Sequence, residues 1–221
     1  MTFKLDSDLS AVNSILGAIG QAPVTKLEFN NPEIGLVYNL LQECTVDVQT
    51  EGWQFNTEEH RYFPLNASNE VVIDKDILRA SLSQDRICKN NSFNVTIRDR
   101  KLYNIDLHTF DFSDWEAQRP VKSGSGWTYE TAPGVSLDVV TLLDFDDLPA
   151  VAQRYVTYCA AQRAATQLVS NSELMQMIEK QTGLLRAQMT NFECEQANAN
   201  FMGYQDPAVY QTYHPFYTLA R

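Results

Sequence analysis

The sequence predicts an α+β fold, in which an antiparallel bundle of four main helices carries an inserted small antiparallel β domain and an extended aromatic C-terminal tail. Apolar residues recur at helical spacing near both ends, short β-type runs replace that spacing after residue 52, and aromatic residues crowd the C-terminus. With 44 % hydrophobic and 20 % charged residues, the composition is that of a globular protein. The expected domains are a discontinuous bundle (1–52 and 147–200), a β insert (53–146) and a docking tail (201–221).

Two helices are expected before the insert. The first has N-cap candidates at Asp6, Ser7 and Asp8 and ends before Gly20 and Pro23. Its apolar stripe is Leu9, Val12, Ile15, Leu16 and Ile19. The second begins near Pro32 and ends at Gly52, because proline is favoured in the first helical turn and glycine just beyond the last. It carries an apolar stripe (Ile34, Val37, Leu41, Cys44 and Val48) and, on another face, an acidic stripe (Glu43, Asp47 and Glu51).

Between about Trp53 and Phe145, short β-type runs alternate with turn-forming residues, which predicts a small antiparallel domain. The clearest unit is a hairpin within residues 93–112, with its turn at Asp99, Arg100 and Lys101. Its alternating apolar positions are Val95 and Ile97 before the turn and Ile105 and Leu107 after it. Further strands are expected at 70–73, 127–131 and 136–143, the last two separated by Ala132, Pro133 and Gly134.

Helical spacing returns after the acidic segment Asp144–Pro149, whose carboxylates are expected to cap a third helix. We expect that helix to bury Val151, Tyr155, Cys159 and Val169 and to offer a small-residue surface at Ala160, Ala161, Ala164 and Ala165. A fourth helix, at about 172–199, has an expected core face of Leu174, Ile178, Leu185, Met189 and Phe192. Gly183 could mark a bend in it.

The C-terminal segment 201–217 is rich in aromatic residues and nearly without charge. Gly203, Pro207 and Pro215 exclude a long helix there. Since each ring gains from burial, we expect the segment to bind either its own helices or a neighbouring subunit. The expected docking residues are Phe201, Tyr204, Tyr210, Tyr213, Phe216 and Tyr217.

The chain carries 17 basic and 28 acidic residues, a formal net charge of −11. This balance argues against gripping nucleic acid, which needs clustered Lys and Arg, but an acidic wall would let DNA pass without sticking. Neither a signal peptide nor a run of ~20 apolar residues is present, so we expect a soluble, cytoplasmic chain without membrane contact. The four well-separated cysteines, Cys44, Cys88, Cys159 and Cys194, are expected to be buried and reduced.

No arrangement typical of catalysis, cofactor binding or metal binding is expected. The three histidines, His60, His108 and His214, are isolated. Glu58 and Glu59 are adjacent in an expected strand and should face opposite sides, so they would not act as a carboxylate pair. Asp144, Asp146 and Asp147 lack calcium-loop spacing, which favours helix capping. The glycine-rich segment 122–126 leads into a β-type run, which indicates a flexible loop and not a phosphate loop.

Four segments in order carry a family resemblance. Residues 9–24 contain LSAVNSIL and IGQAPV, residues 51–59 are EGWQFNTEE, residues 143–149 are LDFDDLP, and residues 218–221 are TLAR. Together they resemble tail tubular protein A of podoviruses, the short-tailed phages. Residues 60–140 are similar to the family only in their general β-rich pattern and not in specific motifs. The family fold, a helical bundle carrying a β domain, agrees with the pattern above.

The resemblance implies a structural adaptor, or gatekeeper, and not an enzyme. Such a subunit forms a dodecameric ring in the virion tail, through whose lumen DNA passes without specific binding. The implied partners are other copies of the chain, the portal protein and the nozzle (tail tubular protein B), with the tail fibre as a further candidate; assembly occurs in the host cytoplasm. Trp53 and Phe55 match a family motif and are expected to anchor the β insert on the bundle. The two long helices could supply the faces that close the ring, and the acidic front half could line its lumen.

Three alternatives differ in class. A tail-associated polysaccharide hydrolase would use carboxylates of the β region. An acidic DNA mimic would need regularly spaced surface carboxylates, which the mildly acidic middle does not favour. A head-completion connector of another tail type would share the helices but would usually lack so large an insert.

Overall fold

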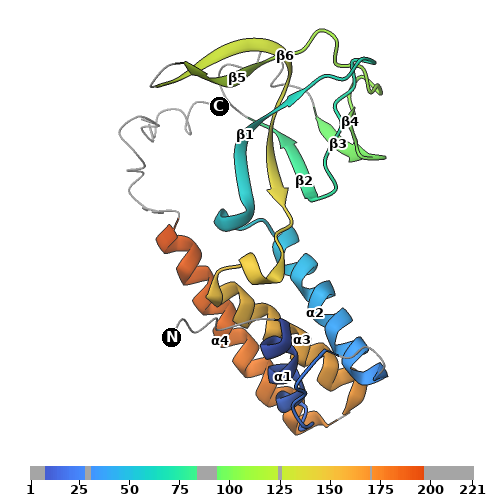
Figure 1. Ribbon diagram of the computed structural model, residues 1–221, viewed down its shortest axis with the longest axis vertical. Helices are drawn as coiled ribbons and strands as arrows, with labels where there is room; N and C mark the ends of the chain where they lie inside the picture. Colours follow the sequence, from blue (N-terminus) through green and yellow to red (C-terminus); the bar gives the residue numbers. More distant parts are fainter. Residues whose placement is uncertain (1–7, 28–30, 84–93, 124–125, 170, 197–221) are drawn as a thin grey trace, which may run out of the picture. The chain divides into compact units, whose positions relative to one another are not determined.

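The computed structural model describes residues 8–27, 31–83, 94–123, 126–169 and 171–196 (Figure 1). This part of the chain contains four α-helices and antiparallel β-sheets, which confirms the mixed α+β class. The chain divides into two compact units, Met1–Leu41 with Pro149–Arg221 and Gln42–Leu148. The division between Leu41 and Gln42 lies inside α2 (Pro32–Thr50), so this helix contributes residues to both units.

The first helix, α1 (Asp8–Ala18), forms where the spacing predicts it. Its apolar stripe is buried from Val12 to Ile19, and Leu9 is half-buried. Gly20 has a φ of +81° and ends the helix, with the Gln21 N–H donating to the Leu16 carbonyl at 2.8 Å and the Gly20 N–H to Gly17 at 3.2 Å. These two bonds are those of a Schellman cap, which glycine favours because it adopts a positive φ without strain.

The third helix, α3 (Ala150–Leu168), contacts both α1 and α4 (Ser172–Gln196). The predicted alanine surface is confirmed, since Ala160, Ala161, Ala164 and Ala165 are at most 2 % exposed. The predicted apolar stripe is wrong in part. Tyr155 is buried, but Val151, Cys159 and Val169 are only half-buried. A helix packed on two sides places small residues inside, because they allow the closest approach of the neighbouring helices.

The fourth helix, α4, has the predicted core face, although only Ile178 and Met189 are fully buried on it. Leu174, Leu185 and Phe192 are half-buried. One polar contact adds to this packing: Arg186 Nη1 donates to the Tyr155 hydroxyl of α3 at 2.9 Å.

The β part is organised around one long strand, β6 (Gly126–Thr141). Its second half pairs antiparallel with β1 (Thr57–Pro64) and β2 (Ile77–Leu82), and its first half pairs with β5 (Glu116–Ser123). A separate two-stranded sheet contains β3 (Val95–Arg98) and β4 (Lys101–Asn104). The predicted break at Ala132, Pro133 and Gly134 is wrong, because β6 continues through these residues.

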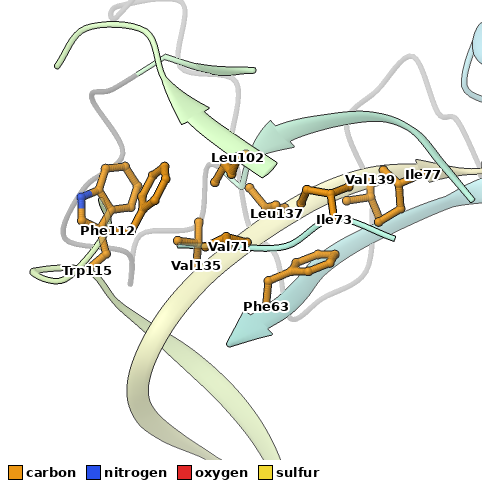
Figure 2. Packing of buried hydrophobic residues seen from close by; sticks show 10 residues of the cluster. All are labelled: Phe63, Val71, Ile73, Ile77, Leu102, Phe112, Trp115, Val135, Leu137 and Val139. Atoms are coloured by element: carbon orange, nitrogen blue, oxygen red, sulfur yellow. The ribbon is translucent and has the colours of Figure 1, made fainter. Parts of the chain in front are cut away.

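Figure 2 shows the core of the β part, in which side chains of the strands and of the intervening loops meet. Phe112 and Trp115, which follow β4, pack edge to face with their ring centroids 5.0 Å apart. The remaining members are Phe63, Val71, Ile73, Ile77, Leu102, Val135, Leu137 and Val139. Aromatic loop residues therefore complete a core that the short strands alone would leave open.

The β3–β4 hairpin confirms one prediction and corrects another. Its turn lies at Asp99 and Arg100, whose φ angles of 51° and 58° match a two-residue type I′ turn. Lys101 belongs to β4, and the buried residue after the turn is Leu102. Ile105 and Leu107, expected on the buried face, lie beyond the strand and are 39 % and 55 % exposed. The expected strand 70–73 forms only isolated bridges, of Val71 with Leu65 and of Val72 with Lys101.

Candidate functional site

The C-terminal end of α2 is the first part of a buried polar junction. Gly52 has a φ of +80°, and its N–H donates to the Gln49 carbonyl at 3.1 Å. The next residue, Trp53, donates its indole N–H to the carbonyl of Val48 at 2.8 Å. Because the last carbonyls of a helix have no intrahelical donor, the Trp53 side chain caps α2 while its ring is buried, at 8 % exposed.

Asn56 connects this helix end to the strands. It closes the 3-10 turn η1 (Gln54–Asn56), where its Oδ1 accepts the Trp53 N–H at 2.8 Å. Its Nδ2 donates to the carbonyl of Gln49 at 2.9 Å and to that of Thr141, in β6, at 3.0 Å. The Thr141 hydroxyl donates back to the Asn56 carbonyl at 3.2 Å. Asn56 is 2 % exposed, so each of these bonds satisfies a group that would cost about 1–3 kcal/mol if left unpaired.

Gln49, in the last turn of α2, holds the chain where it leaves β6. Its Nε2 donates to the Leu143 carbonyl at 2.9 Å, and its Oε1 accepts the Leu143 N–H at 2.8 Å. One fully buried amide thus pairs with both backbone groups of a residue, as a neighbouring strand would. In the other unit, Asn13 of α1 pairs in the same way with Val24, at 2.9 and 2.7 Å.

The structure assigns different surroundings to the two predicted anchors. Trp53 is buried within the junction, whereas Phe55 is half-buried. Gln49 and Asn56, which carry most of the hydrogen bonds of the junction, were not predicted from the sequence. Two features of the sequence could have indicated them. Gln49 directly follows the apolar-stripe residue Val48, and Asn56 ends the short segment in which the chain turns from helix to strand. The six aromatic docking residues of segment 201–217 lie outside the described residues.

The acidic segment before α3 differs from its prediction. Phe145–Asp147 forms a 3-10 turn, η2, with Asp144 as its N-cap residue but without a side-chain cap hydrogen bond. The helix itself begins at Ala150, and its N-cap residue is Pro149, whose side chain has no acceptor atom. The N-cap position of α3 is therefore held by Pro149 and not by one of the predicted carboxylates, all of which precede it in the chain.

An open hollow beside β1 and β5 is lined by charged residues. Glu58 and Glu59 both line it, together with His60 and Arg119. The prediction that the two glutamates face opposite sides is wrong, since a β-bulge between Glu58 and Arg61 interrupts the alternation. Glu58 Oε2 accepts a hydrogen bond from Arg61 Nη1 at 3.2 Å, an exposed ion pair.

His60 lies in this bulge with a φ of 57°. Its backbone N–H donates to Asp138 Oδ1 at 2.9 Å, and its Nδ1 contacts the hydroxyl of Ser83. The same Nδ1 is 3.7 Å from Asp138 Oδ1. In a catalytic triad the serine and the carboxylate contact opposite ring nitrogens, so this Ser, His and Asp group does not have the geometry of a proton relay.

Two ionisable groups have shifted pKa values. The hydrogen bond from Lys101 Nζ to the Glu70 carboxylate, at 3.0 Å, lowers the pKa of Glu70, and Asn66 adds to this effect. Burial raises the pKa of Tyr155, which contacts Arg186. Both groups connect neighbouring elements, Glu70 with β4 and Tyr155 with α4.

Three further features concern binding and location. Among the described residues, no three His, Cys, Asp or Glu side chains are close enough together to hold a metal ion. No helix in the described ranges has both the length and the apolar character needed to span a bilayer. Cys44, Cys159 and Cys194 form no disulfide within the described residues, and only Cys44 of these three is buried. The burial expected for Cys194 is therefore wrong, and Cys88 lies outside the described residues.

The fold and the junction define a class of α+β protein in which helices precede and follow a β part along the sequence, and a buried amide fixes the chain where it leaves the last strand. The family model for Tail tubular protein matches residues 9–199. The chain therefore belongs to the tail tubular protein family, which gives it a structural role in a phage tail and confirms the resemblance. A search of curated proteins finds no match to the chain.

Proposed function

We propose that the chain is the adaptor subunit of a short phage tail, forming a closed, dodecameric ring between the portal and the tail nozzle. The observation that carries this proposal is the family match over residues 9–199, which includes the described helices of both ends and the β part. The proposed partners are further copies of the chain, the portal, the nozzle and the tail fibre. DNA passes through the lumen without specific binding.

The domain roles follow from the same proposal. Residues 1–52 with 147–200 form the bundle that closes the ring, and residues 53–146 form an insert directed to neighbouring tail parts. Trp53 and Phe55 anchor the insert. An outer face of α4 supports a contact between copies, since Met177 and Leu184, one i,i+7 pair on this helix, are 66 % and 67 % exposed.

The aromatic tail, residues 201–221, docks on the portal or on the next subunit in this proposal. Its six aromatic residues would supply the large apolar contact area that anchors an interface. Acidic residues in the front of the chain line the lumen and repel the DNA phosphates, so that the duplex slides without sticking. A lumen lined by Lys and Arg would contradict this assignment.

Electron microscopy of the purified full-length protein, alone and mixed with its portal, tests the proposal. We expect rings with twelvefold symmetry, alone or on the portal, and a central opening wide enough for duplex DNA. A protein that stays monomeric at every concentration and does not bind the portal would overturn the adaptor assignment.

A further inference from the structure

β5 and the first half of β6 form a two-stranded arm, residues 116–123 and 126–133. The two strands pair without a break from Glu116 with Pro133 to Ser123 with Gly126. β1 and β2 pair with β6 only from Gly134 onward, so neither extends the sheet along the arm. Figure 1 shows this ribbon curving away from the sheet that β6 forms with β1 and β2.

The described part of the chain leaves most of the arm's side chains exposed. Of its described side chains only Ala117, near the root, is buried. A two-stranded ribbon without a packed face is marginally stable in water, and so the arm gains stability from any partner that covers it.

One face of the arm has the composition of a protein interface. Pro120 is paired directly with Tyr129, and Lys122 lies two residues further along the same face. Tyr129 is 68 % exposed, and both Pro120 and Lys122 are exposed. An exposed tyrosine beside a proline and a single cation fits a partner that offers a small apolar patch flanked by carboxylates.

The root of the arm is fixed. The Tyr62 hydroxyl donates to the Pro133 carbonyl at 2.7 Å, and the Gly134 N–H donates to the Trp115 carbonyl at 3.1 Å. A Cβ at Gly134 would lie 2.6 Å from the Phe63 carbonyl oxygen and from the Tyr62 ring. The arm is therefore held in one direction at its base, which lowers the entropy lost on docking.

The described part of the same unit carries a surface with the complementary chemistry. Glu43, Asp47 and Glu51 are exposed at four-residue intervals on α2 and form its acidic stripe. Val46, 38 % exposed, lies one helical turn beyond Glu43, at the edge of this stripe. It is an exposed apolar side chain beside carboxylates.

We propose that the β5–β6 arm of one copy docks on the acidic stripe of α2 in the next copy, with Tyr129 against Val46 and Lys122 near Asp47. The contact joins two different surfaces, so it is heterologous and can close into a ring. This inference rests on the proposed function and specifies one of the subunit interfaces that the ring needs.

Disulfide trapping in the full-length protein tests the contact. In a background with Cys88, Cys159 and Cys194 changed to serine, we combine Lys122→Cys with Asp47→Cys and oxidise the assembled protein. A disulfide needs Cα atoms about 4.4–6.8 Å apart, so trapping reports direct proximity. We expect a ladder of linked copies with this pair. The matched control, Lys75→Cys with Asp47→Cys, uses an exposed lysine outside the arm and should give no ladder.

Charge exchange provides the second readout. Lys122→Glu should weaken self-association at least about tenfold, because like charges then face each other, and adding Asp47→Lys should restore it. Lys75→Glu makes the same change in net charge and should leave association unchanged. Wild-type rings without trapping or charge rescue would overturn the docking inference alone. A wild-type chain that never self-associates, with or without the portal, would overturn the proposed function as well.

Discussion

At the scale of single residues, three buried or half-buried amides bond to backbone groups at the ends of helices and strands or in the segments between them. Gln49 pairs with Leu143, Asn13 pairs with Val24, and Asn56 bonds to Gln49 and Thr141. An amide side chain suits this task because it offers a donor and an acceptor side by side, in the geometry of a peptide group. Such residues hold distant parts of the chain in register without adding a strand.

Replacing Gln49 by alanine should therefore destabilise the protein by about 2–4 kcal/mol. The substitution removes the side-chain partner of the N–H and carbonyl of half-buried Leu143 and opens a cavity at the fully buried Gln49 position. Urea unfolding followed by circular dichroism measures this loss. Gln176→Ala, at an exposed position of α4, is the control and should change stability by less than about 0.5 kcal/mol. Equal losses in both variants would show that the Leu143 clamp does not stabilise the fold.

The Glu70 carboxylate predicts a pH dependence. Its pKa in the folded state is lowered, mainly by the hydrogen bond from Lys101, so its stabilising effect is present above the unfolded-state pKa and is lost as the pH falls through the folded-state pKa. Glu70→Gln should lower the unfolding midpoint at pH 7, and the difference from wild type should vanish in acid. A difference independent of pH would contradict the ion pair as its cause.

At the scale of elements, helices were more predictable from the sequence than strands. The apolar stripes of α1, α2 and α4 repeat at helical spacing, and Gly20 and Gly52 end α1 and α2. The local sequence is therefore enough to predict these helices. The hairpin register was missed because its type I′ turn uses Asp99 and Arg100 instead of the usual asparagine and glycine. Strand β6 was divided in the prediction because Pro133 is typical of a strand end, yet it is accommodated at the root of the arm.

Gly134 tests the packing at the root of the arm, and Gly183 in α4 is its control. Gly134→Ala should destabilise the protein by about 1–3 kcal/mol, because the added Cβ has no space beside the Phe63 carbonyl and the Tyr62 ring. Gly183→Ala, in α4 with open space around it, should instead stabilise by up to about 1 kcal/mol through helix propensity. Thermal unfolding of both variants measures the two effects. The same sign in both would contradict the packing at Gly134.

At the scale of the whole molecule, the sequence predicted where the chain changes from helix to strand but not how the two are joined. Trp53 was singled out because it matches the family motif, and its place directly after the glycine that ends α2 lets its indole N–H cap the helix. The bond between Gln49 and Leu143 joins residues 94 positions apart. No local pattern indicates such a pair, because a glutamine amide can bond to the backbone of almost any residue. The family match, by contrast, depends on the order of motifs along the chain and needs no contact to be known.

Deleting the aromatic tail distinguishes docking on another subunit or the portal from packing against the tail's own helices. If segment 201–221 docks on another subunit or on the portal, its deletion should leave unfolding of the isolated chain within about 0.5 kcal/mol of wild type. Ring formation or portal binding, measured by analytical ultracentrifugation, should be lost. If the segment instead covers its own helices, deletion exposes apolar surface and the chain itself becomes less stable. Changing Phe201, Tyr204, Tyr210, Tyr213, Phe216 and Tyr217 to serine keeps the length and tests the rings alone. A destabilised chain that still assembles would contradict the docking role.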